Sequence, residues 1–279
     1  MTNLLDETRY ELALANRIIA HEGVLDGFGH VSVRHPHDPG RYLLARSRSP
    51  ELIEPSDLLE FTLDSEPVTP PKGEMYGERV IHGCIYQARP DVTAVCHHHS
   101  HAVLPFCVAD VPFEPVFHMG PVMGQTVPLW DSRDEFGDTD LMVVKPEEGR
   151  SLARSLGANW MVLMARHGAT VAGRTLRELV FRTVYSHANA EIQLRALAIG
   201  KIAPLNQAER QRAEPRQLQP RPMARAWEYW TTRLAKANGL PPQAAARSAA
   251  KAKAKRSTKE ASKAARKRPV KARAKRSRR

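Results

Sequence analysis

Three consecutive histidines, His97, His98 and His99, close an apolar, β-branched stretch that begins at Val92. Side chains two residues apart on a strand point to the same face, so His97 and His99 would share one face and His98 the other. Two imidazoles at this spacing can bind one metal ion from a rigid platform. The pattern therefore predicts a metal site, and the alternative is a surface histidine cluster with incidental metal affinity.

A third ligand has to come from elsewhere in the chain, and His167 is the natural candidate. Arg166-His167-Gly168 interrupts two apolar stretches, 160–164 and 169–172, with polar residues and a glycine. Three neutral imidazoles with an open coordination position form a Lewis-acid site. Imidazole ligands suit Zn, Mn, Co and Fe, so the sequence predicts one divalent metal ion per subunit and leaves its identity open.

Glu78 stands at the start of a predicted helix, 78–88, that leads into the histidine strand. A carboxylate there can act as a general acid/base or as a fourth metal ligand. The alternative is an acid that is favoured at a helix N-terminus by the helix dipole.

Two polar segments are candidates for substrate binding. Glycines precede His30 and Ser32, and such a segment lets backbone amides approach an anion closely. Arg46 and Arg48 follow in a turn, where guanidinium groups match carboxylate geometry. An ordinary hairpin and a solvated loop are the respective alternatives. His118 could reach the site from a proline- and glycine-rich loop, 111–129, or be an ordinary polar loop residue.

These residues must be positioned by an alternation of helices and strands. Periodicity predicts helices at 4–22, 56–61, 78–88, 101–109, 151–156, 176–197 and 224–237, and strands at 28–34, 43–45, 92–99, 160–164 and 169–172. Strands that interleave with helices indicate an α/β or α+β class.

The 279 residues are 42% hydrophobic, which suits a globular protein, and no apolar run approaches the ~20 residues that a bilayer requires. The N-terminus has no apolar stretch typical of a signal peptide, so we expect a cytoplasmic protein that does not associate with a membrane. Three cysteines without a CxxC pair indicate buried, reduced thiols rather than a disulfide framework.

The basic charge belongs to one end of the chain. Of the formal net charge of +12, residues 247–279 contribute +15, from sixteen Lys or Arg and one acid, so the remainder carries −3. By composition, residues 204–222 are a polar linker that contains several prolines. The predicted helix after it carries Trp227, Tyr229 and Trp230, and we interpret these residues either as core or as a cover for a neighbouring subunit's site. We expect a catalytic domain at 1–203, a linker and C-terminal helix at 204–242, and a disordered tail at 243–279. The tail is interpreted foremost as a solubility or localisation appendage, and non-specific polyanion binding at low salt is the alternative.

In their order, these motifs resemble the class II aldolase/adducin family. The resemblance covers roughly residues 5–200 and rests on the Gly-x-x-Ser of 29–32, the block Arg89-Pro90-Asp91-Val92, the segment 94–100 and the segment 163–168. It implies an α/β, three-layer fold with a central, mainly antiparallel sheet flanked by helices. It also implies a metal on His97, His99 and His167, usually zinc in aldolases, with Glu78 as proton shuttle, and a homotetramer with active sites at subunit interfaces.

The departures from the phosphosugar aldolases fall on their phosphate pocket. This chain has His30 where they carry Asn, an Arg-Ser-Arg-Ser segment at 46–49 where they carry a Thr/Ser/Gly-rich loop, and Tyr76-Gly77 where they carry paired serines. The Gly-His-x-Ser and Tyr-Gly-Glu-Arg segments are more similar to a branch with aromatic-acid decarboxylases, such as the hydroxymethylpyridine dicarboxylate and dihydroxyphthalate enzymes, and iron-dependent prenylated hydroxyphenylpyruvate oxygenases.

The resulting prediction is a divalent-metal-dependent carbon–carbon lyase, foremost a decarboxylase of a small (hydroxy)aromatic or hydroxy/keto carboxylic acid. His30, Ser32, Arg46, Arg48, Tyr76 and His118 are the predicted substrate-binding residues. The alternatives are an aldolase that cleaves a hydroxy-keto substrate, an iron-dependent oxygenase of the same fold, and a non-catalytic, adducin-like assembly protein.

Overall fold

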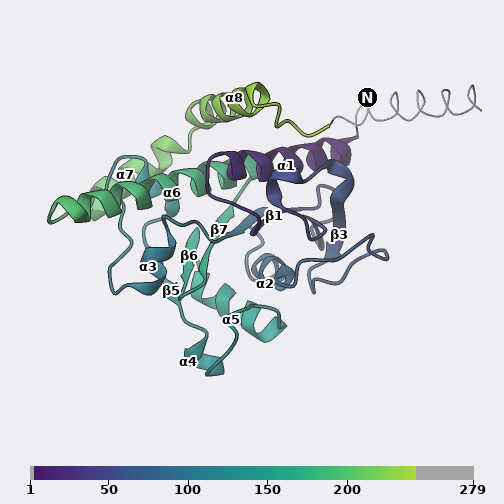
Figure 1. The fold of residues 1–279 in the computed structure, drawn as a ribbon, viewed down its shortest axis with the longest axis horizontal. Helices are drawn as coiled ribbons and strands as arrows, with labels where there is room; N and C mark the ends of the chain where they lie inside the picture. Colours follow the sequence, from purple (N-terminus) through teal and green to yellow (C-terminus); the bar gives the residue numbers. More distant parts are fainter. Residues whose placement is uncertain (1–2, 243–279) are drawn as a thin grey trace, which may run out of the picture. The chain divides into compact units, whose positions relative to one another are not determined.

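A seven-stranded sheet forms the centre of the computed structural model, which describes residues 3–242 (Figure 1). The strand order is β3-β2-β1-β4-β7-β6-β5, and every neighbouring pair is antiparallel except β5 and β6. The strands are β1 (His30–Arg34), β2 (Arg41–Ala45), β3 (Leu58–Thr62), β4 (Ala94–His98), β5 (Leu129–Trp130), β6 (Met161–Met164) and β7 (Gly168–Gly173). The expected mainly antiparallel sheet is confirmed.

Helices cover both faces of the sheet and bury two separate apolar clusters (Figure 1). On one face pack α1 (Leu4–His21), α6 (Leu176–Ile199) and α8 (Pro220–Lys236), and on the other pack α2 (Arg79–Ala88) and α5 (Pro146–Leu156). The three-layer α/β class is therefore confirmed. The other helices of residues 3–242 are η1 (Pro50–Leu52), η2 (Pro55–Asp57), α3 (Leu104–Val108), η3 (Gly120–Met123), α4 (Arg133–Phe136) and α7 (Gln207–Gln217).

One predicted helix, 56–61, is wrong. Glu54 and Asp57 form a capping box that supports only the single 3₁₀ turn η2, and β3 follows directly. Residues 58–62 then pair in register with β2, from Ala45 opposite Leu58 to Arg41 opposite Thr62. Residues typical of a helix start therefore precede a strand here. Pairing with β2 gives residues 58–62 backbone hydrogen bonds, whereas a short isolated helix is only marginally stable.

The segment 204–222, predicted as a linker, contains helix α7. Asn206 accepts from the Glu209 backbone N–H and Glu209 accepts from that of Asn206, a capping box that starts the helix. Arg210 reaches back from α7 to the carbonyl of Gln125 and to Glu114. These long-range contacts stabilise a helix whose polar sequence has no buried face of its own.

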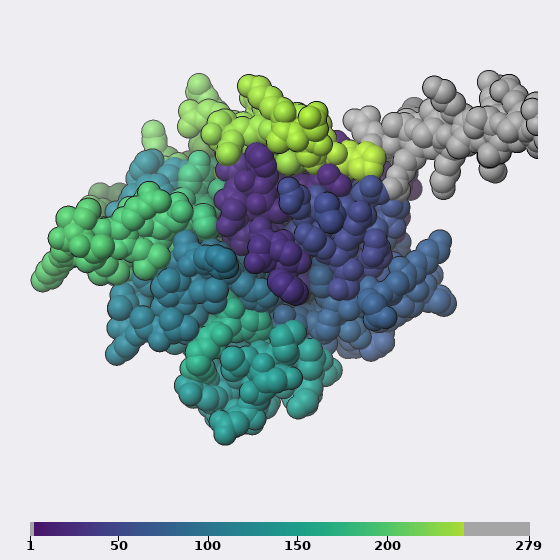
Figure 2. All heavy atoms as spheres, in the orientation of Figure 1, coloured from purple at the N-terminus to yellow at the C-terminus, as the bar shows by residue number. Residues whose placement is uncertain are grey.

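Helix α8 packs against the body of the protein along α1 (Figure 2). Trp227 and Trp230 lie buried in the apolar cluster that α1 and α6 share, which supports the interpretation of this part of α8 as core. Tyr229, in contrast, is 58% exposed. Arg233 binds Glu22 at 2.6 and 2.7 Å and fixes the far end of α8.

Among residues 3–242, no helix combines the length and apolarity needed to cross a bilayer. Cys84, Cys96 and Cys107 are free and buried, as predicted. The expectations for the tail at 243–279 lie outside the described residues.

Candidate metal centre

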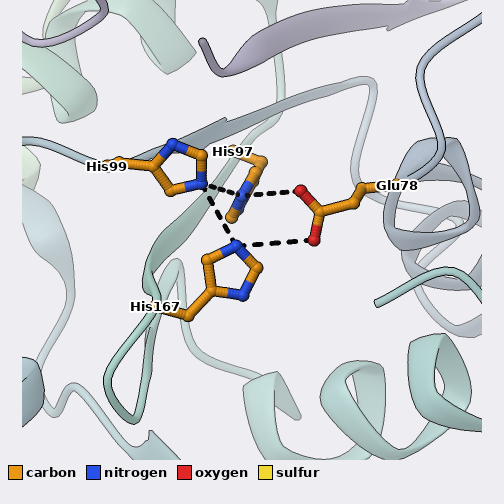
Figure 3. A group of neighbouring side chains, drawn as sticks. All are labelled: Glu78, His97, His99 and His167. Carbon is orange, nitrogen blue, oxygen red and sulfur yellow. Dashed lines mark hydrogen bonds and ion pairs between the residues drawn. The ribbon is translucent and has the colours of Figure 1, made fainter. Parts of the chain in front are cut away.

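Three imidazoles and one carboxylate converge at one end of strand β4 (Figure 3). The Nε2 atom of His99 lies 2.9 Å from that of His97 and 3.1 Å from that of His167. The carboxylate of Glu78 closes the group, with Oε2 at 3.6 Å from His97 Nε2 and Oε1 at 3.4 Å from His167 Nε2. The structure thus brings together all three predicted ligands and the predicted acid from distant parts of the chain.

Local structure explains how the two strand-borne histidines reach the same place. His97 lies within β4, paired with Thr170 of β7 and His30 of β1, and His99 follows one residue beyond the strand. The side chain of His98 points to the opposite face, where it is fully buried. The alternation of a strand therefore separates the functional pair from its middle neighbour, as the spacing predicted.

His167 is placed by a tight turn between β6 and β7. Arg166 adopts a left-handed backbone conformation, with φ of 62°, which is unfavourable for residues that carry a Cβ. Its guanidinium binds Asp131 at 2.6 Å and its backbone N–H donates to the carbonyl of Cys107 at 2.8 Å. Gly168 then lies against β4, where an added Cβ would stand 2.4 Å from the carbonyl oxygen of His98. Only glycine permits so close an approach of the two strands.

Glu78 is the N-cap residue of α2, and its side chain turns inward instead of capping the helix. The carboxylate is 5% exposed and its Oε1 accepts from the backbone N–H of Val143 at 3.1 Å. Burial raises the pKa of Glu78, while the neighbouring His167 lowers it. A carboxyl group in this environment can hold a proton nearer to neutral pH than an exposed one.

Burial lowers the pKa of each of the three imidazoles, with the neighbouring histidines adding to the effect on His97. They are therefore neutral, which is the form that binds metals. The orientation of the His97 ring is also fixed, because its Nδ1 lies 3.3 Å from the hydroxyl of Thr170. Neutral imidazoles that direct their Nε2 atoms at one point, beside a carboxylate, fit a divalent transition-metal ion.

A cavity of about 440 Å³ opens beside these groups and includes Glu78 and His99 in its wall. Three predicted substrate-binding residues, His30, Arg48 and Tyr76, line it. Arg48 binds Asp57 at 2.5 Å, and Tyr76 donates its hydroxyl to the carbonyl of Arg48. The exposed ring of Phe28 stands at the same cavity.

The other three predicted substrate-binding residues lie elsewhere. Ser32 is fully buried and does not line the cavity. Arg46 binds Asp57 at 2.9 Å from beside the cavity, so one carboxylate holds both guanidiniums. His118 lines a different cavity, between α6 and α8, together with Tyr185 and Tyr229.

Sequence reasoning missed three residues of this region: His82, Tyr86 and Asp57. Both side chains of α2, His82 and Tyr86, are buried; His82 is hydrogen-bonded to His30 and Ser32, and Tyr86 to Ser32. A pattern that could have identified them is present in the sequence, since Glu78, His82 and Tyr86 recur every four residues and share one face of α2. Asp57 has no comparable pattern, because its arginine partners come from another turn.

The family described as Class II Aldolase and Adducin N-terminal domain matches residues 10–194. A similar relative is the decarboxylase tropJ of Talaromyces stipitatus, 32% identical over 235 residues, which cover 76% of this chain and 88% of that protein. The 3,4-dihydroxyphthalate decarboxylase of Arthrobacter keyseri is 26% identical over 69% of this chain and 79% of its own length.

Among solved structures, the L-fuculose 1-phosphate aldolase of Glaciozyma antarctica superposes with a TM-score of 0.71. The superposition covers 85% of this chain and 93% of the aldolase chain at 20% identity, so the similarity establishes the fold alone.

Proposed function

Because the chain belongs to the class II aldolase and adducin family, we propose that it is a divalent-metal-dependent lyase that removes a carboxyl group from a small, carboxylated aromatic compound. The observation that carries the proposal is the group of three neutral imidazoles and one buried carboxylate beside a cavity that also contains Arg48. Both relatives named above, tropJ and the 3,4-dihydroxyphthalate enzyme, bear the name decarboxylase and match this chain over most of their length.

His97, His99 and His167 are the residues that would hold the ion, which is Zn, Mn, Co or Fe. When bound, such an ion acts as a Lewis acid that stabilises negative charge on a substrate oxygen. The remaining part of the site, with Glu78 on one side and the open cavity on the other, leaves room for a substrate. The assignment of these ligands is a proposal that rests on their convergence.

Glu78 is the proposed proton carrier. As the bond between the ring carbon and the carboxyl carbon breaks, its electron pair stays on the ring carbon and CO2 leaves. The proton that Glu78 holds on a carboxyl oxygen then forms the new C–H bond. The raised pKa of Glu78 and the hydrogen bond from Val143, which fixes one oxygen, support this role.

Arg48 and Tyr76 are the proposed contacts for a substrate carboxylate and ring. Arg46 and Arg48 share the single carboxylate of Asp57, so this end of the cavity has one positive charge in excess. An excess guanidinium favours an anionic substrate, and the aromatic rings of Phe28 and Tyr76 in the cavity wall favour a planar one. Arg46 binds Asp57 from beside the cavity and Ser32 lies buried behind it, so both would support the substrate less directly. His118 lines another cavity and would not contact a substrate bound in its own subunit.

An aldolase is the second candidate function, since retro-aldol cleavage would use the same metal and the same proton carrier. Arg46-Ser47-Arg48-Ser49 stands where the phosphosugar aldolases carry their Thr/Ser/Gly-rich phosphate loop, and this departure makes a sugar phosphate the less favoured substrate. An iron-dependent oxygenase would hold its ion on the same three histidines. A non-catalytic, adducin-like assembly protein would not need them, so the ligand set favours an enzyme over an assembly protein.

The deciding experiment measures metal content and CO2 release together. We expect about one divalent metal per chain in the purified protein, lost in the His97→Ala/His99→Ala double variant, and CO2 release from dihydroxyphthalates. Glu78→Gln should retain the metal and lower kcat about 10²- to 10⁴-fold. Oxygen consumption with bound iron would favour the oxygenase, cleavage of a hydroxy-keto compound would favour the aldolase, and a protein that never binds metal would favour the assembly role.

We further propose a cytoplasmic homotetramer, with 1–203 as catalytic domain and 243–279 as a basic tail. The family resemblance supports the assembly, and the apolar cavity that holds His118 and the exposed Tyr229 would then face a neighbour. Light scattering should give about four times the 31.2 kDa of one chain. A monomer in solution would contradict the proposal.

A further inference from the structure

A chain of buried polar groups runs away from the cavity behind His30. His30 Nδ1 lies 2.6 Å from His82 Nε2, and His82 Nδ1 lies 2.6 Å from the Ser32 hydroxyl. The Ser32 hydroxyl lies 2.7 Å from that of Tyr86. His82, Ser32 and Tyr86 are at most 1% exposed, whereas His30 lines the cavity. Since Nδ1 of His30 is engaged by His82, Nε2 is the ring atom available to the cavity.

Burial keeps these groups in one protonation state. It lowers the pKa of His82 to about 3, so His82 is a neutral ring with one N–H. It also raises the pKa of the Tyr86 hydroxyl far above neutral pH, so Tyr86 keeps its proton. Each group in this chain of polar groups can therefore donate only one hydrogen, and the direction of one hydrogen bond sets the direction of the next.

The hydrogen bond that the Tyr86 hydroxyl donates, at the end of this chain of polar groups, decides between the two possible directions of donation. In one direction, Tyr86 donates to Ser32, Ser32 to His82 Nδ1, and His82 Nε2–H to His30 Nδ1, so that these three hydrogens lie on bonds of 2.6 or 2.7 Å. The fourth hydrogen, on His30 Nε2, then faces the cavity, where solvent or a ligand can accept it. In the other, Ser32 donates to Tyr86, whose own hydrogen must reach the carbonyl of Thr93 at 3.5 Å. A contact of 3.5 Å is at the limit of a hydrogen bond, so the first direction is more stable.

We propose that Ser32 and His82 are positioning residues that hold His30 as the tautomer with its hydrogen on Nε2, so that His30 presents a fixed hydrogen-bond donor to the cavity. Tyr86 completes the chain by donating to Ser32. The geometry thus assigns to Ser32, which does not reach the cavity, an influence on what the cavity binds.

The ligand group that this donor selects is an oxygen acceptor. A carboxylate or phenolate oxygen accepts from N–H, whereas a protonated amine in the same place would leave two donors facing each other. His30 stands between Tyr76 and His97, at ring-centroid distances of 4.6 and 5.2 Å, so the selected oxygen lies beside the candidate metal centre. This assignment of the oxygen to a substrate rests on the proposed lyase function, and the tautomer itself does not.

The tautomer can be read from the ring nitrogen resonances of His30 in zinc-loaded, ¹⁵N-histidine-labelled protein, with His30→Gln used to identify its signals. We expect the Nε2–H form in the unmodified chain and a mixture of both tautomers in Ser32→Ala, because His82 then loses the donor at Nδ1. Ser65→Ala is the matched control: it also removes a buried hydroxyl bonded to a buried tyrosine, here Tyr42, and should leave His30 unchanged. The Nδ1–H form in the unmodified chain, or no change in Ser32→Ala, would overturn the proposal.

Calorimetric binding of phthalate to the same zinc-loaded proteins tests the contact with the ligand. We expect about twofold weaker binding in Ser32→Ala than in the unmodified chain, because an equal mixture of tautomers halves the population that presents the donor, and no change in Ser65→Ala. Equal phthalate affinity in spite of a changed tautomer would refute the donor role of His30. If no protein binds phthalate, the substrate assignment fails while the tautomer measurement still stands.

Discussion

Gly168→Ala offers a sharp test of how the fold places the candidate metal centre. The added Cβ would lie 2.4 Å from the His98 carbonyl oxygen and 3.0 Å from Cδ2 of the His99 ring. Real Cβ contacts essentially never fall below 3.0 Å, so β7 and β4 must separate by at least about 0.6 Å. Metal–ligand distances tolerate only about 0.2 Å. The separation is therefore about three times what the centre can absorb.

We expect Gly168→Ala to weaken zinc affinity about 10- to 100-fold, as measured by competition with a chromophoric chelator. The overpacking should also lower the free energy of unfolding by about 1–3 kcal/mol. Gly173→Ala provides a matched control on the same strand, because its Cβ would meet the backbone of Leu179 at 2.8 and 2.9 Å, away from the histidines. This control should lose comparable stability and keep its zinc affinity. Unchanged zinc binding in Gly168→Ala, or an equal loss in both variants, would refute the reasoning.

Three further predictions follow from charge and burial. His82 has a pKa lowered to about 3, below the ~6.5 of an unfolded histidine, so the unfolded chain takes up the proton first. As the pH drops below about 6.5, His82 should lower the stability by up to about 1.4 kcal/mol per pH unit, in addition to the contribution of other buried histidines. Urea unfolding of the unmodified chain and of His82→Gln at pH 7 and 5 measures the difference, and an equal slope in both would contradict the prediction. Arg48→Met should raise KM for a carboxylated substrate about tenfold with a smaller change in kcat. Arg41 is a partly exposed arginine that pairs with Asp38 and does not line the cavity, so Arg41→Met should leave KM unchanged. Removal of the residues after Pro242 should abolish polyanion binding at low salt and spare turnover, and a marked fall in turnover would make the tail part of the enzyme.

Much of the fold could be predicted from the sequence where its elements have a period of their own. Helix α1, helix α2 and strand β4 lie close to their predicted positions, because their apolar residues recur at the spacing of one buried face. The alternation that separates His98 from its two neighbours is likewise a local property of a strand. Two errors, at 56–61 and 204–222, concern segments with weak periodicity, which became β3 and α7 through partners distant in the chain.

Residue types and their spacing were thus enough to identify the residues with the chemistry of a metal centre: two histidines two apart on a strand, a third before a glycine, and an acid at a helix start. Tertiary packing selected which polar residues reach the cavity. It put Arg48 and Tyr76 into the wall, buried Ser32 behind it, and turned His118 toward another cavity. The physical reason is that residue type and spacing fix the face on which a side chain lies, whereas the pairing of strands and the packing of helices fix what that face meets.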